Sequence, residues 1–151
     1  MSVIIQGSEL RTLNYGRRTS KSTGTLAATT VALFTVAGGQ VALTSIYGVV
    51  GTAITVANSY ALQHNPTAGT TVPLFAAYDL GTTDTAVGEL LSFTGDSSGA
   101  VLSFGGAVET LRAPFVLAAG QIESVSAGTD GEITWYVTWE PLTDGATLVA
   151  A

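Results

Sequence analysis

Short runs of alternating apolar and polar residues, separated by glycine-rich turns, recur along most of the chain. Because successive side chains of a strand point to opposite faces, this alternation predicts strands. Three pairs of runs are joined by short turns and are expected as hairpins, at 29–36 with 41–50, 87–94 with 100–104, and 121–126 with 132–140. Single strands are expected at 59–63, 72–78, 114–117 and 146–149. No window combines an apolar repeat at helical spacing with capping residues, so the body is predicted to be all-β.

The segment 132–140 shows the clearest alternation. Polar side chains and Tyr136 fall on one face, and the other face holds Ile133, Trp135, Val137 and Trp139. We expect the two tryptophans to anchor a core rather than to form a platform for a ligand. About ten short strands of this kind predict an antiparallel β-sandwich, a jelly roll or a β-barrel.

Segments 29–36 and 41–50 lack a clean polar face. A strand that is apolar on both faces must be covered on both, and a two-layer sandwich covers only one. The second cover is expected to be either the chain's own loops or another copy of the chain, since large apolar patches usually mark interfaces. Subunit contacts are therefore predicted at Leu33, Phe34, Val41, Leu43, Ile46, Tyr47 and Val49.

Charged residues are scarce, at 11% of 151 residues against about 25% in an average soluble domain. Residues 22–78 contain no Asp, Glu, Lys or Arg. Small neutral residues take their place, with 23 Thr, 21 Ala and 18 Gly. Thr suits a strand's outward face and Gly suits tight turns, so the composition agrees with a single β domain. Polar residues interrupt the uncharged stretch too often for a membrane span, and the first ten residues do not resemble a secretory signal.

The few charges are unevenly placed. Residues 1–21 hold four cations against Glu9 alone, a net charge of +3, and residues 22–151 hold Arg112 against ten acidic residues, a net charge of −9. We predict an extended basic arm over 1–24 and a single sandwich domain over 25–151. The arm is either a solvated terminus or a segment that docks on an acidic partner. Binding of nucleic acid is the weakest of the three hypotheses. The proposed docking residues are Arg11, Arg17, Arg18 and Lys21.

The sequence offers little catalytic chemistry. It has no cysteine, which removes disulfides, thiol chemistry and Cys-based zinc sites, and its one histidine, His64, precedes Asn-Pro and is expected in a turn. No nucleophile elbow or phosphate-binding loop occurs. Acidic residues in the turns 79–84, 95–99 and 128–132 do not fit a calcium loop and are expected to bind their own backbone. We predict no catalytic residue, no metal, no cofactor and no enzyme, although a sequence does not exclude a carboxylate pair in a cleft.

Two long segments resemble small structural proteins encoded by tailed bacteriophages and prophages. They are "TLAATTVALFTVAGGQVALTSIYGVVGTAITVANSYALQHNPTAGTTVPL" (25–74) and "GEITWYVTWEPLTDGATLVAA" (131–151). In those proteins a hairpin of the form "LFTV.GG" precedes an "NPT.GT" turn, and a Trp-containing strand ends the chain. The resemblance covers most of 25–151, and residues 1–21 match least. Capsid decoration (cement) proteins are the most similar class.

That resemblance implies a non-enzymatic protein made in the host cytoplasm and located on the capsid surface of the virion. It implies the major capsid protein as partner, self-association as a homotrimer, and stabilisation of the shell against DNA pressure. No nucleic-acid or membrane partner is expected. The alternatives are a tail, neck or fibre component, or a carbohydrate-binding module for the host surface, in which Tyr136 and other exposed aromatic residues should cluster on one face.

Overall fold

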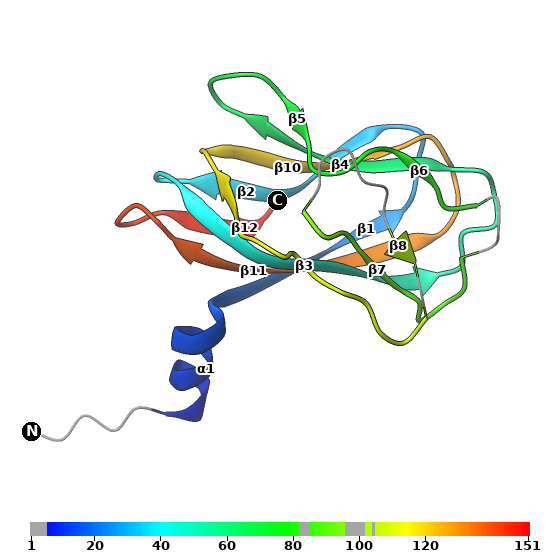
Figure 1. Cartoon of the computed structure of the whole chain (residues 1–151). Coiled ribbons are helices and arrows are strands. Elements are labelled where there is room, and N and C mark those ends of the chain that lie inside the picture. The colour runs from blue at the N-terminus through cyan, green and yellow to red at the C-terminus, as the bar shows by residue number, and fades with distance from the viewer. Residues whose placement is uncertain (1–5, 82–84, 96–101, 104) are drawn as a thin grey trace, which may run out of the picture.

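Two antiparallel β-sheets lie face to face, with the core between them (Figure 1). This computed structural model describes residues 6–81, 85–95, 102–103 and 105–151. Over those residues the predicted all-β sandwich is confirmed. Sheet A runs in the order β1 (Arg17–Thr25), β11 (Glu132–Pro141), β3 (Val41–Thr52), β7 (Leu90–Ser92) and β8 (Leu102–Ser103), and β9 (Phe115–Leu117) also pairs with β3. Sheet B runs in the order β12 (Thr147–Ala150), β2 (Thr30–Ala37), β10 (Gly120–Ser126), β4 (Ser59–Pro66) and β5 (Val72–Pro73), and β6 (Tyr78–Asp79) also pairs with β4.

The two sheets meet at an aromatic contact in the middle of the core. Trp135 of β11 and Tyr60 of β4 are both fully buried, with ring centroids 6.2 Å apart and planes 5° from parallel. The Trp135 indole Nε1 donates a hydrogen bond of 2.8 Å to the Tyr60 hydroxyl, so the polar atom of each ring has a partner. Trp139 is also buried, which confirms that both tryptophans anchor the core.

Only one of the three expected hairpins forms. β7 and β8 pair with each other, as predicted for 87–104. By contrast, β2 lies in sheet B and β3 in sheet A, and the chain crosses between the sheets in the same way from β10 to β11. The expected hairpins at 29–50 and 121–140 are therefore wrong. A short turn between two strands is equally compatible with a crossover between packed sheets, and alternation does not distinguish the two.

A β-bulge explains why β2 seemed apolar on both faces. Opposite β10, Phe34 pairs with Ile122 and Ala32 pairs with Glu123, so Leu33 is an extra residue in the ladder. An extra residue changes the phase of the alternation, and the consecutive side chains of Leu33 and Phe34 are both fully buried in the core.

The same device occurs in β3. Ser45 pairs with Thr138 and Leu43 pairs with Trp139, so Thr44 is the extra residue. The inward positions of β3 therefore shift by one residue at Thr44. Five of the seven residues predicted at a subunit contact are fully buried in the core: Leu33, Phe34, Val41, Leu43 and Ile46. Since one chain already covers these five, they do not form an interface.

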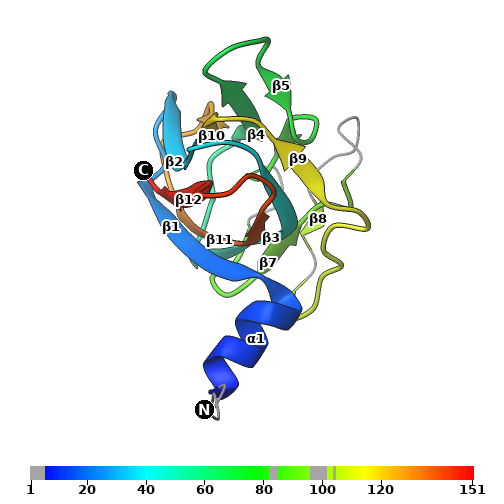
Figure 2. The ribbon, with the colours of Figure 1, turned by 90° about the vertical axis from the view of Figure 1, so that its left-hand side faces the viewer.

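The second half of the basic segment joins the body instead of forming an extended arm outside it. Residues 17–25 make β1, which pairs with β11 along the edge of sheet A. β1 also lies beside β12, the edge of sheet B, and the Thr19 hydroxyl donates to the Leu148 carbonyl at 3.3 Å (Figure 2). The expected boundary at residue 24 therefore falls inside a strand.

Residues 7–15 form a helix that the sequence patterns did not predict, α1 (Gly7–Tyr15). Figures 1 and 2 show α1 projecting beyond the sandwich. Among the described residues, no helix is long and apolar enough to span a bilayer.

Replacing Tyr60 with Phe should lower the free energy of unfolding by about 1–3 kcal/mol, because the buried Trp135 N–H would lose its acceptor. Urea unfolding followed by tryptophan fluorescence measures the change. Tyr78→Phe is the matched control, since Tyr78 is 43% exposed. Equal losses in the two variants would show that the buried hydrogen bond contributes nothing specific.

Candidate functional site

Helix α1 is held at both ends by local contacts. The Glu9 carboxylate accepts the Gln6 backbone N–H at 2.8 Å, and the Gly16 N–H donates to the Thr12 carbonyl at 2.9 Å. Gly16 has φ 85°, and a Cβ there would lie 2.7 Å from the Trp139 carbonyl oxygen, so this position requires glycine. Glu9, three residues after Gln6, and Gly16, directly after Tyr15, are the sequence features from which this helix could have been predicted.

Large apolar side chains on α1 face solvent. Leu10 is 47% exposed, Leu13 68% and Tyr15 72%. An isolated helix of nine residues is marginal in water, and most helices in proteins are stabilised by packing an apolar face. In the described chain that face of α1 is left open.

Two hollows flank α1 where it meets sheet A, each with a volume of about 330 Å³. The first hollow is lined by Arg11, Thr12, Tyr15, Gly16, Arg18 and Thr138. The second hollow is lined by Thr12, Leu13, Gly16, Arg17, Trp139, Glu140 and Pro141. The helix therefore forms a ridge between two depressions, each of which contains arginine.

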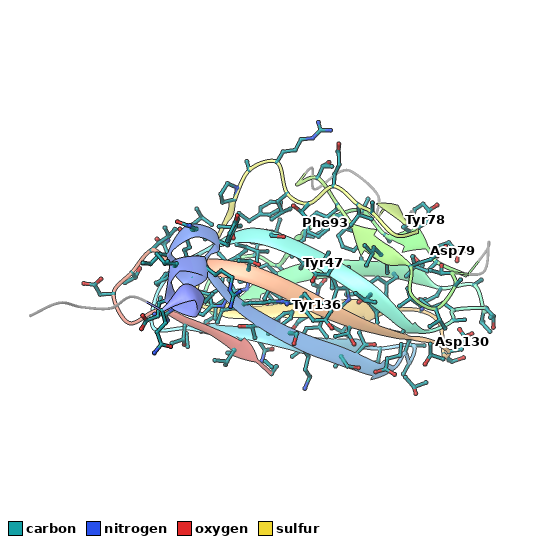
Figure 3. All side chains as sticks on the ribbon, turned by 90° about the horizontal axis from the view of Figure 1, so that it is seen from below. Tyr47, Tyr78, Asp79, Phe93, Asp130 and Tyr136 are labelled. Carbon is teal, nitrogen blue, oxygen red and sulfur yellow. The ribbon has the colours of Figure 1, made fainter. Side chains whose placement is uncertain are left out.

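Aromatic rings position the arginines of β1. The Arg18 guanidinium carbon lies 4.6 Å from the centre of the Tyr136 ring, and its Nη2 donates a 2.9 Å hydrogen bond to the Tyr47 hydroxyl. Tyr47 and Tyr136 stack with centroids 5.1 Å apart, on neighbouring strands of sheet A (Figure 3). Arg17 lies 5.3 Å from the centre of the Trp139 ring. Such contacts hold a guanidinium in place without neutralising it.

Three of the four predicted docking residues come together here. In the part of the chain that the structure describes, the one ion pair joins Arg112 to Glu109 at 3.5 Å, so Arg11, Arg17 and Arg18 have no carboxylate partner. We call the set Leu10, Arg11, Leu13, Tyr15, Arg17 and Arg18 the α1 surface.

Lys21 does not belong to the α1 surface. It lies opposite Trp135 in the ladder, and its ammonium group donates to the Ala151 carbonyl oxygen at 2.6 Å. It therefore helps to join the edges of the two sheets. Of the residues expected at a subunit contact, Tyr47 and Val49 are the two that remain partly exposed.

The titratable groups with shifted pKa values lie away from the α1 surface. His64, expected in a turn, lies in β4, and neither ring nitrogen has a hydrogen-bond partner among the described residues. Burial lowers the pKa of His64, and the backbone of Gln121 and Ala118 and the Glu123 carboxylate oppose this shift only in part. Burial raises the pKa of Tyr60.

Turn carboxylates hold the far end of the sandwich together. Asp130 accepts the Thr55 N–H and hydroxyl, both at 2.8 Å, and these bonds lower the pKa of its carboxyl. Asp79 accepts the Asn58 and Gly81 N–H groups at 2.8 and 3.0 Å. Figure 3 places Asp79 and Asp130 at the end away from α1. The bond from Gly81 to Asp79 lies within one turn, as predicted, whereas Asp130 binds the backbone of a distant segment instead of its own turn.

The remaining turn acids give no metal site in the described residues. Asp84 and Asp96 lie outside the described ranges. Within those ranges, no group of three or more His, Asp or Glu side chains is close enough to hold a metal ion.

Comparisons with family models, with curated proteins and with solved structures found no match for the chain.

The free energy of unfolding should fall as the pH drops below about 6.5, the ordinary pKa of histidine. Because the folded chain holds His64 with a lowered pKa, the unfolded chain binds the proton more readily in this range. Urea unfolding at pH 7.5, 6.0 and 5.0 measures the trend. His64→Leu should flatten it, and an unchanged slope would assign the trend to other groups. Asp130, whose pKa is lowered from 3.8, acts only at more acidic pH.

Proposed function

We propose that the chain is a non-enzymatic virion structural protein of the capsid-decoration class. It binds the outer surface of the capsid lattice through the α1 surface and stabilises the shell. The observation that carries the proposal is a helix outside the sandwich with exposed Leu10 and Leu13, next to arginines that no described carboxylate neutralises. The resemblance of 25–151 to phage structural proteins supports the choice of partner.

Apolar burial would supply most of the attachment energy. Fully burying one leucine contributes roughly 1.5–3 kcal/mol, and the side chains of Leu10 and Leu13 are already partly covered, so each contributes less than that. The contribution of each copy is modest, and many copies on a lattice add up to a stiffer shell.

Charge would set the orientation of attachment. The chain carries a net charge of −6, whereas the α1 surface is basic. An acidic capsid surface would attract the α1 end and repel the remainder of the body. The major capsid protein is therefore the proposed partner, and the capsid surface of the virion is the proposed location.

Self-association remains part of the proposal, with a homotrimer as the expected state. The five residues buried in the core cannot supply the contact, so Tyr47 and Val49 on the outer face of sheet A are the candidates that remain. Tyr136 lies beside Tyr47 on that face, and tyrosine is enriched in interfaces.

One observation supports the carbohydrate-binding alternative and another opposes it. Tyr47 and Tyr136 do cluster on one outer face, as that alternative requires. However, the Tyr136 ring already contacts Tyr47 and the Arg18 guanidinium, which leaves less of the ring for stacking on a sugar. A tail, neck or fibre component would use the α1 surface equally well and differs in copy number.

Deleting residues 2–15 should abolish attachment to particles that lack the chain, and the double variant Leu10→Ser, Leu13→Ser should weaken it about 100-fold. Both should keep the thermal midpoint, because these side chains face solvent. A deletion that extends to residue 21 is unsuitable, since it removes much of β1. Co-sedimentation with particles measures binding.

The matched control is Val116→Ser, Val149→Ser, in which two exposed valines on β9 and β12 are changed. It should bind like the unaltered chain. Attachment that survives the α1 deletion would overturn the role of the α1 surface.

The copy number of the chain per purified particle should be a simple fraction of the capsid-protein copy number. A lattice-wide decoration protein repeats with the lattice, whereas a tail or neck component is present in a handful of copies. Quantitative mass spectrometry against the major capsid protein gives the ratio. Complete absence from particles would remove the virion proposal.

A further inference from the structure

We propose that the first hollow is a carboxylate-binding site, which receives one Asp or Glu side chain from the surface of the partner. The inference rests on the proposed function for the identity of that partner, whereas the chemistry of the site comes from the residues that line it. Arg11 and Arg18 lie at the hollow together with the hydroxyl-bearing residues Thr12, Tyr15 and Thr138.

Two arginines line the hollow from different elements. Arg11 comes from α1 and Arg18 from β1, and Gly16 joins the two elements directly. A planar guanidinium matches the two oxygens of a carboxylate, and charge-assisted bonds of this kind are stronger than neutral ones. A hollow of about 330 Å³ has room for the carboxyl group and its stem.

The Arg18 side chain is held in place before any ligand binds. Its guanidinium lies against the Tyr136 ring and donates one hydrogen bond, to Tyr47. A guanidinium carries five N–H donors, so the others remain for a ligand. Because the side chain is positioned before binding, less conformational entropy is lost when a carboxylate arrives.

No carboxylate of the described chain lines the first hollow. Glu140 lines the second hollow, on the other side of α1, and Glu9 is engaged with the Gln6 N–H. Arg11 and Arg18 therefore line one hollow without a carboxylate counterion among the described residues. Two neighbouring cations that lack a counterion favour an external anion.

The surroundings favour a carboxylate on a protein surface over a polyanion. Residues 22–151 carry a net charge of −9, which would repel a nucleic acid that extends beyond the hollow. Leu13 and Tyr15, both largely exposed, lie beside the arginines and need an apolar neighbour. An acidic side chain flanked by apolar groups meets both requirements.

The test uses the full chain and three single substitutions. Arg11→Gln and Arg18→Gln should each weaken binding to particles at least tenfold. Arg18→Lys should give an intermediate loss, because it keeps the charge and removes the fork. Arg112→Gln is the matched control, since Arg112 is exposed and has its own partner, Glu109, and it should bind unchanged.

A second measurement is independent of any particle. Titration of the isolated chain with tetraglutamate, followed by amide NMR shifts, should perturb Thr12, Gly16 and Thr138, and Arg11→Gln should remove the response. Arg11 lies on the projecting helix, so this variant remains informative even where Arg18 variants fold poorly. Tripolyphosphate is the competing probe.

The outcomes separate the two proposals. A response to tetraglutamate without binding to particles would overturn the proposed function and support the carboxylate site. Wild-type affinity of both glutamine variants for particles, with loss only in the Leu10, Leu13 variant, would overturn the site and support the function. Tighter arginine-dependent binding of tripolyphosphate than of tetraglutamate would also overturn the carboxylate assignment.

Discussion

The burial of Trp135 against Tyr60, by ring packing and a hydrogen bond, marks which face of β11 points into the core. Because side chains alternate along a strand, Trp135 inside places Tyr136 outside. Tyr136 stacks on Tyr47 and supports Arg18, so the outer site depends on the inner contact. A slip of β11 by one residue would put tryptophan in water and remove the support of Arg18. The core and the α1 surface therefore share one strand and one register.

Most strands and the sandwich architecture could be predicted from alternation, and the pairing could not. The strong period in 132–140 gave the right face for both tryptophans. Pairing failed because a short turn can join strands of one sheet or of two packed sheets. The burial of Leu33 and Phe34 failed because a bulge changes the phase of alternation within one strand. The bulge is visible in the sequence, because large apolar residues occupy odd positions up to Leu33 and even positions from Phe34 onward. This pattern indicates one apolar face with an inserted residue and not a second apolar face.

The candidate site was predicted in part. Clustered cations near the beginning of the chain pointed to Arg11, Arg17 and Arg18, and the structure brings these three together around α1. Lys21 was misassigned because charge counting ignores position along the strand: it lies four residues beyond Arg17 on the same face of β1, where its ammonium group reaches Ala151 instead of either hollow. The helix was missed because its apolar residues do not repeat far enough to show a helical period. Its caps, which are local, were the better signal.

The long uncharged stretch now has a physical explanation that does not need a neighbouring copy. Most of its large apolar residues in β2, β3 and β4 are covered within one chain, and the bulges in β2 and β3 set which of them face the core. Many of its outward positions carry hydroxyl or small side chains, which are hydrated without charge, and Val31, Val56 and Val72 are large apolar residues that stay exposed. The charged residues therefore have different roles at the two ends of the sandwich. At the end away from α1, carboxylates bind backbone N–H groups, and at the α1 end, arginines have no carboxylate partner among the described residues. A molecule polarised in this way meets an acidic surface in one orientation, because only the α1 end is attracted to it. The orientation of the chain on such a surface would then depend on the uncharged stretch 22–78 as well as on the arginines near α1, because no cation in that stretch competes with them.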